Sequence, residues 1–393
     1  MAVALPNIRT LKDLHVRNQP VFIRLDFNVP LSEPDAEGLR KVEDDTRITE
    51  ALPTIKTVME KGGKLILASH LGRPDGKRTP EDSLEPVARR LAELLETEVT
   101  LAEDCVGEGI ELMVKNMTPG QVLLLENLRY HPGEEANSLE FCHDLARLAN
   151  VYINDAFGTA HRKHASVYGV PMVMDQRGAG LLIEKELLFL NRLLNQPARP
   201  FYTILGGSKV SDKIKTIENL LPGVQGLCVG GAMAYAFLAA KGEKVPPQAK
   251  QPGADDIRAA ESILREAKKR ELPVLLPVDT VDTFDIGPQT IELFKKFLAG
   301  AKTVFWNGPL GWFEKPEYAT GTFEIAKMLA EVKALKVVGG GDTVSAIHQS
   351  GMTAGFDHLS TGGGAVLKYL EGKSLPGIDA LRITQKAQSP VLE

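Results

Sequence analysis

Glycine-rich segments recur in the second half of the chain, and all but the last directly follow a short apolar run. They are GGSK (206–209), GG (230–231), NGP (307–309), GGGDT (339–343) and STGGG (360–364). Glycine lets backbone N–H groups approach a phosphate closely, and a following helix adds its partial positive charge. A single glycine pair is ordinary turn chemistry. Several pairs in one half of the chain instead favour a site for a nucleotide polyphosphate.

Two of these segments carry charged side chains that suit this ligand. Lys209 and Lys213 are four residues apart. A helix opening near Ser208 would place both on one face, although solvated surface lysines remain the alternative. Asp342 precedes Thr343, and its carboxylate suits either a helix cap or a ligand of Mg²⁺. The two roles of Asp342 are compatible, and the sequence leaves both open.

Arginines follow apolar runs in the first half of the chain. Arg73, Arg129 and Arg162 all come shortly after such runs. Guanidinium groups bind phosphate and carboxylate through paired hydrogen bonds, so the pattern predicts a small phosphorylated acid as substrate. The formal net charge of −5 excludes a generally basic, nucleic-acid-coating protein and requires the positive charge to be local.

The elements that must position these residues are short buried strands alternating with helices. Helical spacing of apolar residues marks segments such as 80–95 and 255–270. Consecutive apolar positions predict strands buried on both faces, as parallel sheets require. The predicted strands are 21–27, 65–68, 122–125 and 151–153, then 201–205, 227–229, 274–278, 303–306 and 336–338. We therefore predict an α/β fold with two doubly wound, Rossmann-like parallel-sheet domains.

The join between the two domains is predicted in a leucine-rich helix at 179–194. Pro197 and Pro200 stop this helix before the second strand series begins at Phe201. The predicted division is an N-terminal domain at 1–178, a hinge helix at 179–196 and a C-terminal domain at 197–379.

Composition excludes several other classes of protein. Cys105, Cys142 and Cys228 are too far apart for a disulfide framework or a paired metal knuckle, which predicts buried thiols and a reducing, cytoplasmic setting. No apolar run is long enough to span a bilayer, and no leader is evident, so we expect no membrane partner. Neither G-x-G-x-x-G nor a Walker A motif is present.

Eight segments in order resemble the signature motifs of the phosphoglycerate kinase family: RLDFNVP, SHLGRP, ENLRYHPGEE, INDAFGTAHR, LGGSKVSDKI, WNGPLGWFE, GGGDT and STGGGA. They span the chain from about Val21 to its C-terminal part. The resemblance implies reversible phosphoryl transfer from 1,3-bisphosphoglycerate to ADP, giving 3-phosphoglycerate and ATP, with Mg²⁺, in glycolysis and gluconeogenesis. It further implies that residues 380–393 return to the first domain.

The resemblance also assigns residues, position by position. Glycerate ligands would lie in the N-terminal domain at Asp26, Phe27, Asn28, Arg47, His70, Leu71, Gly72, Arg73, Arg129 and Arg162. Nucleotide ligands would lie in the C-terminal domain at Gly207, Lys209, Lys213, Gly230, Gly231, Asn307, Pro309, Glu314, Gly340, Gly341, Asp342 and Thr343. Asp342 matches the family's metal ligand, and Glu314 matches its ribose contact. The chain departs from the family pattern at Ser208, Trp312, Val366 and Lys368.

The attacking oxygen in this reaction is already ionised, so no general base is needed. We expect catalysis by alignment and charge stabilisation on domain closure, carried by Arg47, Lys209 and Lys213 with the amides of Gly363 and Gly364. Which lysine contacts the transferring group stays open at this stage. A monomer is expected. The rival functions are a nicotinamide dehydrogenase and a non-catalytic protein that binds phosphorylated ligands.

Overall fold

A computed structural model of the chain describes residues 7–383. The described residues divide into two compact units, one formed by the residues up to Leu187 together with those from Ser374, and one formed by Leu188–Lys373. The division falls inside helix α7 (Leu181–Asn195), which begins at Leu181 rather than at the predicted Ala179. No helix among residues 7–383 is both long and apolar enough to cross a bilayer.

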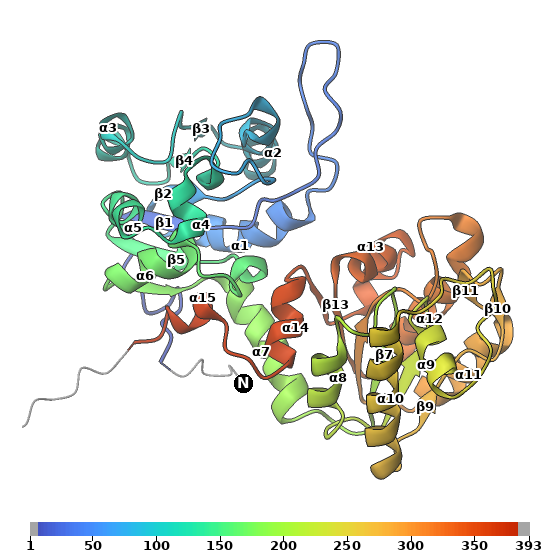
Figure 1. Cartoon of the computed structure of the whole chain (residues 1–393). Coiled ribbons are helices and arrows are strands. Elements are labelled where there is room, and N and C mark those ends of the chain that lie inside the picture. Colours follow the sequence, from blue (N-terminus) through green and yellow to red (C-terminus); the bar gives the residue numbers. More distant parts are fainter. Residues whose placement is uncertain (1–6, 384–393) are drawn as a thin grey trace, which may run out of the picture. The chain divides into compact units, whose positions relative to one another are not determined.

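The first unit is built on a six-stranded sheet with the order β3-β4-β2-β1-β5-β6 (Figure 1). All its neighbouring strands are parallel. The strands are β1 (Pro20–Arg24), β2 (Lys64–Ala68), β3 (Val99–Leu101), β4 (Val122–Leu124), β5 (Val151–Asn154) and β6 (Arg177–Ala179). The helices are α1 (Thr46–Glu60), α2 (Glu85–Leu95), α3 (Glu108–Asn116), α4 (Pro132–Ala136), α5 (Leu139–Ala146), α6 (Val170–Val173) and α15 (Pro376–Asp379). Short helices lie at η1 (Pro80–Asp82), η2 (Leu128–Tyr130), η3 (Phe157–Thr159) and η4 (Ala165–Gly169).

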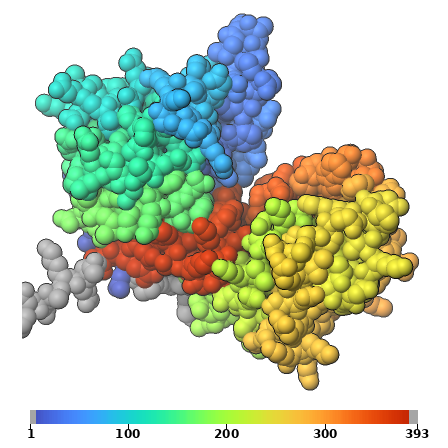
Figure 2. All heavy atoms as spheres, in the orientation of Figure 1, coloured from blue at the N-terminus to red at the C-terminus, as the bar shows by residue number. Residues whose placement is uncertain are grey.

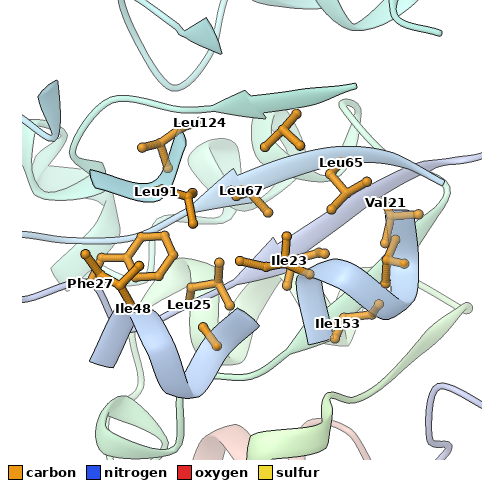
Figure 3. Packing of buried hydrophobic residues seen from close by; sticks show 14 of the residues in the cluster. Val21, Ile23, Leu25, Phe27, Ile48, Leu65, Leu67, Leu91, Leu124 and Ile153 are labelled. Carbon is orange, nitrogen blue, oxygen red and sulfur yellow. The ribbon is translucent and has the colours of Figure 1, made fainter. Parts of the chain in front are cut away.

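Both faces of this sheet are buried, as the consecutive apolar positions predict. Val21 and Ile23 of β1 pack with residues of β2, α1 and α2 on one face (Figure 3). Phe22 points to the other face, where its ring stacks on that of Tyr152 at 5.8 Å. Alternation along β1 therefore fills two core layers, which is the packing that a doubly wound sheet requires.

The second unit repeats this design with the order β14-β13-β12-β7-β8-β9, again all parallel. The strands are β7 (Phe201–Leu205), β8 (Gly226–Val229), β9 (Val274–Leu275), β12 (Thr303–Asn307), β13 (Leu335–Gly339) and β14 (His358–Ser360), with a separate hairpin of β10 (Thr280–Val281) and β11 (Asp285–Ile286). The helices are α8 (Ile214–Leu220), α9 (Ala234–Ala240), α10 (Ala254–Lys269), α11 (Pro288–Leu298), α12 (Thr320–Glu331), α13 (Gly341–Gln349) and α14 (Gly364–Leu370), with short η5 (Pro316–Tyr318) and η6 (Thr353–Gly355). Val304 and Trp306 of β12 join one core cluster, and Phe305 is buried on the opposite face.

Two parallel-sheet α/β units confirm the predicted fold class. The last described residues belong to the first unit: the backbone of Arg382 bridges to Ile8, and the amide of Ile383 donates to the carbonyl of Asn7 at 2.7 Å. Residues 384–393 of the predicted returning tail lie outside the described residues.

The connection between β1 and α1 projects from the first unit as a long loop, coloured blue in Figures 1 and 2. Leu31 and Val42 pair as an antiparallel bridge at its base. The amide of Ser32 donates to the carbonyl of Lys41, and the amide of Asp35 donates to that of Leu39. The base of this loop is therefore fixed, and Arg47 follows it on the first turn of α1.

Candidate active site

The predicted glycerate ligands follow the carboxyl ends of the central strands of the first sheet. The chain reverses its winding between β1 and β5, because β2, β3 and β4 lie on one side of β1 and β5 and β6 lie on the other. Ligands of doubly wound sheets bind where such a reversal opens a crevice. The segments that carry Asp26, His70, Arg129 and Arg162 follow β1, β2, β4 and β5, all at this edge.

Arg47 is held against the segment that follows β1. Its Nη1 atom donates to the carbonyl oxygen of Asn28 at 2.8 Å and lies 3.3 Å from Oδ1 of Asp26. The side chain of Asn28 in turn accepts a hydrogen bond from the amide of Gly72 at 2.9 Å. The loops after β1 and β2 are thus tied together, with one guanidinium group oriented on them.

His70 marks the centre of a positively charged cluster. The residue is buried, and its Nδ1 atom lies 3.3 Å from Nη2 of Arg24. Burial lowers the pKa of His70 well below its usual value, and the charges of Arg24, Arg129, Arg162 and Arg47 lower it further. These guanidinium groups from four parts of the chain therefore converge on one neutral imidazole.

Arg129 is nearly completely buried within this cluster. Its Nη1 atom donates to the carbonyl oxygen of Gly72 at 2.6 Å, and its Nε atom lies 3.0 Å from a carboxylate oxygen of Glu135. Burial lowers the pKa of Arg129; Glu135 opposes this shift, and the like charges of Arg162 and Arg24 add to it. A bound anion would relieve the repulsion among these guanidinium groups, so the cluster favours a phosphate or carboxylate ligand.

Arg24 and His164 belong to this cluster, and the sequence analysis missed both. Arg24 is fully buried at the end of β1, where its Nε atom donates to Oγ of Ser166 at 2.7 Å and Nη1 donates to the carbonyl of Leu25. Burial and the charges of Arg24, Arg162 and Arg129 lower the pKa of His164 to about 3. The available signal for Arg24 is a guanidinium group inside an otherwise apolar strand, a residue type that is almost never buried without a partner.

The remaining predicted glycerate ligands differ in their placement. The side chains of Phe27 and Leu71 lie in the hydrophobic core, where Figure 3 shows Phe27 beside Ile48. A substrate contact from either residue would therefore come from its backbone. Arg73 is exposed, and within residues 7–383 its side chain forms no ion pair. Arg162 is partly exposed in the segment after η3.

A cleft of about 220 Å³ lies at the corresponding edge of the second sheet. The winding of that sheet reverses between β7 and β12, and the cleft opens beyond the carboxyl ends of these two strands. Its lining residues are Gly207, Ser208, Lys209, Asp212, Lys213, Asn307, Gly308, Pro309, Gly340, Asp342, Thr343, Gly363 and Leu367. The fold thus gathers four of the five glycine-rich segments around one cavity.

Lys213 occupies the floor of this cleft. Its Nζ atom donates to the carbonyl oxygen of Gly206 at 2.6 Å and lies 3.3 Å from that of Asn307. Burial lowers the pKa of Lys213 to about 8, against the opposing attraction of Asp342 and Asp212. An ammonium group held by strand-end carbonyls, with its charge only partly compensated, is suited to a phosphate ligand.

Two glycines make this arrangement of the backbone possible. Gly308 has a φ of 97°, and a Cβ atom there would lie 2.1 Å from the carbonyl oxygen of Gly206 and 2.7 Å from Nζ of Lys213. Gly207 has a φ of 86°. L-residues rarely adopt such angles, and the space around Gly308 admits no side chain. Glycine at these positions is required by the close approach of the two strand ends.

The predicted helix from Ser208 is wrong. Helix α8 begins only at Ile214, and Lys213 is its N-cap residue. Residues 208–213 form a turn because Asp256 of α10 accepts hydrogen bonds from the amides of Val210 at 3.0 Å and Ser211 at 2.9 Å. Lys209 is exposed on this turn at the rim of the cleft, so the two lysines are not equivalent.

Asp342 is not a helix cap. The N-cap residue of α13 is Gly340, with a φ of 96°, and Asp342 lies exposed in the first turn without a side-chain cap bond. Its carboxylate lines the cleft, where the adjacent Thr343 Oγ1 accepts a hydrogen bond from the amide of Gly308 at 2.7 Å. One free carboxylate in a cleft with the half-buried ammonium group of Lys213 fits a Mg²⁺ ion that takes its other ligands from phosphate and water. Asp212, which sequence reasoning did not single out, also lines the cleft.

The other predicted nucleotide ligands lie beside the cleft or away from it. Gly231 packs against it, since a Cβ atom there would lie 2.7 Å from the amide nitrogen of Gly207. Gly230 is buried next to Leu310. Gly341 and Gly364 begin α13 and α14, adjacent to lining residues. Glu314 is exposed and does not line the cleft.

Of the four departures from the family pattern, the exposed Ser208 lines the cleft, and the other three lie outside it. The ring of Trp312 is partly exposed, meets Phe284 edge-on at 5.6 Å and carries Nζ of Lys315 at 4.0 Å on its face. Val366 is buried in α14, and Lys368 is exposed on the same helix. None of these three side chains lines the cleft.

Comparison with known proteins agrees with this geometry. The family model described as phosphoglycerate kinase matches residues 11–283 and 282–373. The chain belongs to the phosphoglycerate kinase family. It is 48% identical over 400 residues to the phosphoglycerate kinase of Anaeromyxobacter dehalogenans strain 2CP-C, covering 95% of this chain and 99% of that protein. It is 47% identical over 403 residues to that of Acidobacterium capsulatum, covering 95% and 98%.

Solved structures of phosphoglycerate kinases share the fold. That from Coxiella burnetii superposes with a TM-score of 0.83 at 36% identity, covering 95% of this chain and 98% of the other. That from Pyrococcus horikoshii OT3 has the same TM-score at 32% identity and the same coverages. Membership of the phosphoglycerate kinase family makes the protein a kinase, a transferase of glycolysis.

Proposed function

We propose that the protein transfers a phosphoryl group reversibly from the acyl phosphate of 1,3-bisphosphoglycerate to ADP, giving 3-phosphoglycerate and ATP. The carboxyl group of 3-phosphoglycerate is then the acceptor in the reverse direction. The observation that carries the proposal is the cleft at β7 and β12, where a half-buried Lys213 and an exposed Asp342 lie among glycine-rich turns. That combination suits a metal-bound polyphosphate.

The glycerate ligand is assigned to the first unit. The guanidinium groups of Arg24, Arg129, Arg162 and Arg47 around His70 supply the charge for a phosphate and a carboxylate. His70 and His164 have pKa values lowered by burial and by these guanidinium groups, so both are neutral donors or acceptors at neutral pH. Neither is needed as a base, because the attacking carboxylate or phosphate oxygen is ionised already.

Catalysis is assigned to alignment and charge stabilisation. Arg47, Lys213 and Lys209 stabilise the equatorial oxygens of the transferring group, with the amides of Gly363 and Gly364. The half-buried position of Lys213 makes it the better candidate for the phosphoryl group, and the rim position of Lys209 suits an outer phosphate. Asp342 would hold Mg²⁺, which would neutralise charge on the nucleotide phosphates when bound. We call the arginine cluster around His70 and the cleft around Lys213 the two half-sites. We infer that α7 acts as a hinge that lets them meet and exclude water.

The cysteines indicate the setting of the reaction. Cys105, Cys142 and Cys228 are buried free thiols, as predicted, which suits a reducing cytoplasm. We propose a monomer that acts on small phosphorylated molecules, without nucleic acid or membrane partners.

A coupled assay tests the reaction directly. Purified protein with 3-phosphoglycerate, ATP and Mg²⁺ should form 1,3-bisphosphoglycerate, detected by a downstream dehydrogenase that consumes NADH. Lys213→Ala should lower kcat by about 10²–10³-fold, because it removes a charged donor from the transferring group. Lys215→Ala, at an exposed position two residues along, should retain the full rate. A wild-type chain that binds both substrates yet forms no product would support the non-catalytic rival.

Calorimetry separates the dehydrogenase rival. The protein should bind Mg·ADP, and Asp342→Asn should weaken that binding. Binding of NAD without binding of ADP would overturn the proposed function.

A further inference from the structure

A cluster of metal-ligating side chains lies outside the two half-sites, in the first unit. Asp104, Cys105 and His131 each present one ligand atom, and these atoms lie within 4.8 Å of one another. Asp104 and Cys105 follow β3, whereas His131 follows η2. Among residues 7–383 this is the one group of three such residues that the fold brings together. In the sequence the cysteine has no neighbouring Cys or His that would mark a metal motif.

The two segments that meet here are fixed by their own contacts. The carboxylate of Asp104 accepts a hydrogen bond from the amide of Cys105 at 2.6 Å and lies 2.6 Å from Nε2 of His131. The Sγ atom of Cys105 is buried and donates to the carbonyl oxygen of Glu126 at 2.9 Å. The ring of His131 stacks on Phe141 at 4.9 Å, which restricts its rotation.

This donor set selects for one class of ion. Thiolate, imidazole and carboxylate together suit Zn²⁺ and similar borderline divalent ions, whereas Mg²⁺ prefers oxygen ligands. A tetrahedral Zn²⁺ ion, with bonds of about 2.0–2.3 Å, holds its ligand atoms roughly 3.5 Å apart. The ligand atoms of Asp104, Cys105 and His131, which lie within 4.8 Å of one another, therefore need only small side-chain movements to bind such an ion. Asp104 and His131 are partly exposed, which gives an ion access and leaves room for a water as fourth ligand.

We propose that Asp104, Cys105 and His131 form a binding site for a Zn²⁺-class ion that is separate from the Mg²⁺ requirement of the phosphoryl-transfer reaction. Binding forms three protein–metal bonds and breaks two hydrogen bonds, the one from Cys105 to Glu126 and the one between His131 and Asp104, with the thiol proton released to solvent. The ion would tie the segment after β3 to the segment that carries Arg129, two residues before His131.

Cobalt spectroscopy on the full-length, tag-free chain tests the site. Addition of Co²⁺ in the presence of excess Mg²⁺ should produce one equivalent of a near-ultraviolet thiolate-to-cobalt charge-transfer band, which Zn²⁺ should abolish by displacement. Cys105→Ser should remove the band. Cys142→Ser, which alters another buried thiol of the same unit, should keep it.

A second pair of variants avoids the buried core. His131→Gln should weaken binding of Zn²⁺ at least tenfold by calorimetry, because one of three protein ligands is lost. His143→Gln, at an exposed histidine of α5, should have no effect. Asp342→Ala should also leave the cobalt band unchanged, which separates this site from the nucleotide cleft. No thiolate band in the wild type, or a band that survives in Cys105→Ser, would overturn the proposal.

Discussion

The ammonium group of Lys213 donates a hydrogen bond of 2.6 Å to the carbonyl oxygen of Gly206, at the end of the central strand β7. Burial in this position lowers the pKa of Lys213 to about 8 from its ordinary value of 10.5. The charge that the proposed reaction requires is therefore lost within the experimental pH range, and the loss can be measured.

We expect kcat/KM for the nucleotide to decrease above about pH 8, approaching tenfold per pH unit, because the neutral amine no longer stabilises phosphate charge. Phosphate groups, with a second pKa of about 6, stay ionised throughout this range. Lys213→Arg retains its charge at these pH values, so its profile should stay flat above pH 8 even if its rate is lower. The same descending limb in both proteins would show that another group titrates.

Arg162 should contribute to binding of 3-phosphoglycerate without contributing to stability. It lies near enough to His70, Arg129 and His164 to lower the pKa of each. Arg162→Ala should raise the KM for 3-phosphoglycerate by about tenfold to a hundredfold through loss of a charge-assisted hydrogen bond. The Tm should stay constant or increase, because repulsion within the cluster is reduced.

The neighbouring Lys163→Ala is the matched control, since its ammonium group instead lies over the ring of Tyr168 at 5.6 Å. Steady-state kinetics and thermal unfolding on both variants give the comparison. Equal changes of KM in the two variants would contradict a specific role for Arg162.

Asp155 should make stability depend on pH. Its Oδ1 atom accepts hydrogen bonds from the amides of Leu182 at 2.9 Å and Ile183 at 3.2 Å, at the start of α7. Burial raises its pKa from 3.8 to about 7. The folded state thus holds a proton that the unfolded state has released, so the stabilisation is complete below about pH 4 and is lost as pH rises to about 7.

Relative to Asp155→Asn, which does not titrate, the wild type should lose about 1.4 kcal/mol of unfolding free energy per pH unit between about pH 5 and pH 6.5. Urea unfolding at several pH values measures this difference. A pH-independent difference for Asp155→Asn would mean that its pKa is not raised in the folded state.

Gly308 should tolerate no side chain. Gly308→Ala places a methyl group 2.1 Å from the carbonyl of Gly206 and 2.7 Å from Nζ of Lys213, at a φ of 97°. We expect a loss of about 2–5 kcal/mol in stability from strain and overpacking, with weaker binding of ADP. Gly351 has a φ of 73° but nothing within 4 Å of an added Cβ atom.

Gly351→Ala is therefore a control for backbone strain alone. It should lose about 1–2 kcal/mol and keep its affinity for ADP. Unfolding and ADP titration distinguish the two variants. An equal loss of stability in both variants would show that the close approach of residue 308 to Gly206 adds no destabilisation of its own.

The sequence determined the fold class and most of the central strands. Runs such as 65–68 and 227–229 are apolar at every position. Such a run is a local property of the chain, and it is typical of a strand that is buried on both faces. The edge strands β3, β6 and β14 were missed. Each has only three residues, β6 contains Arg177 and Gly178, and β3 is largely uncovered, so no apolar run marks them.

The motifs also determined which residues gather at the strand ends, because parallel strands present their carboxyl ends at one edge. Only the tertiary structure decided which of those residues are buried and which are exposed. Asp256, far along the chain, keeps residues 208–213 out of a helix and leaves Lys213 half-buried and Lys209 exposed. The inclusion of Arg24 around His70, and the meeting of Cys105 with His131, likewise depend on contacts between distant segments. Contacts between distant segments form only when the sheet is assembled, so no local pattern encodes which polar side chains those contacts bury.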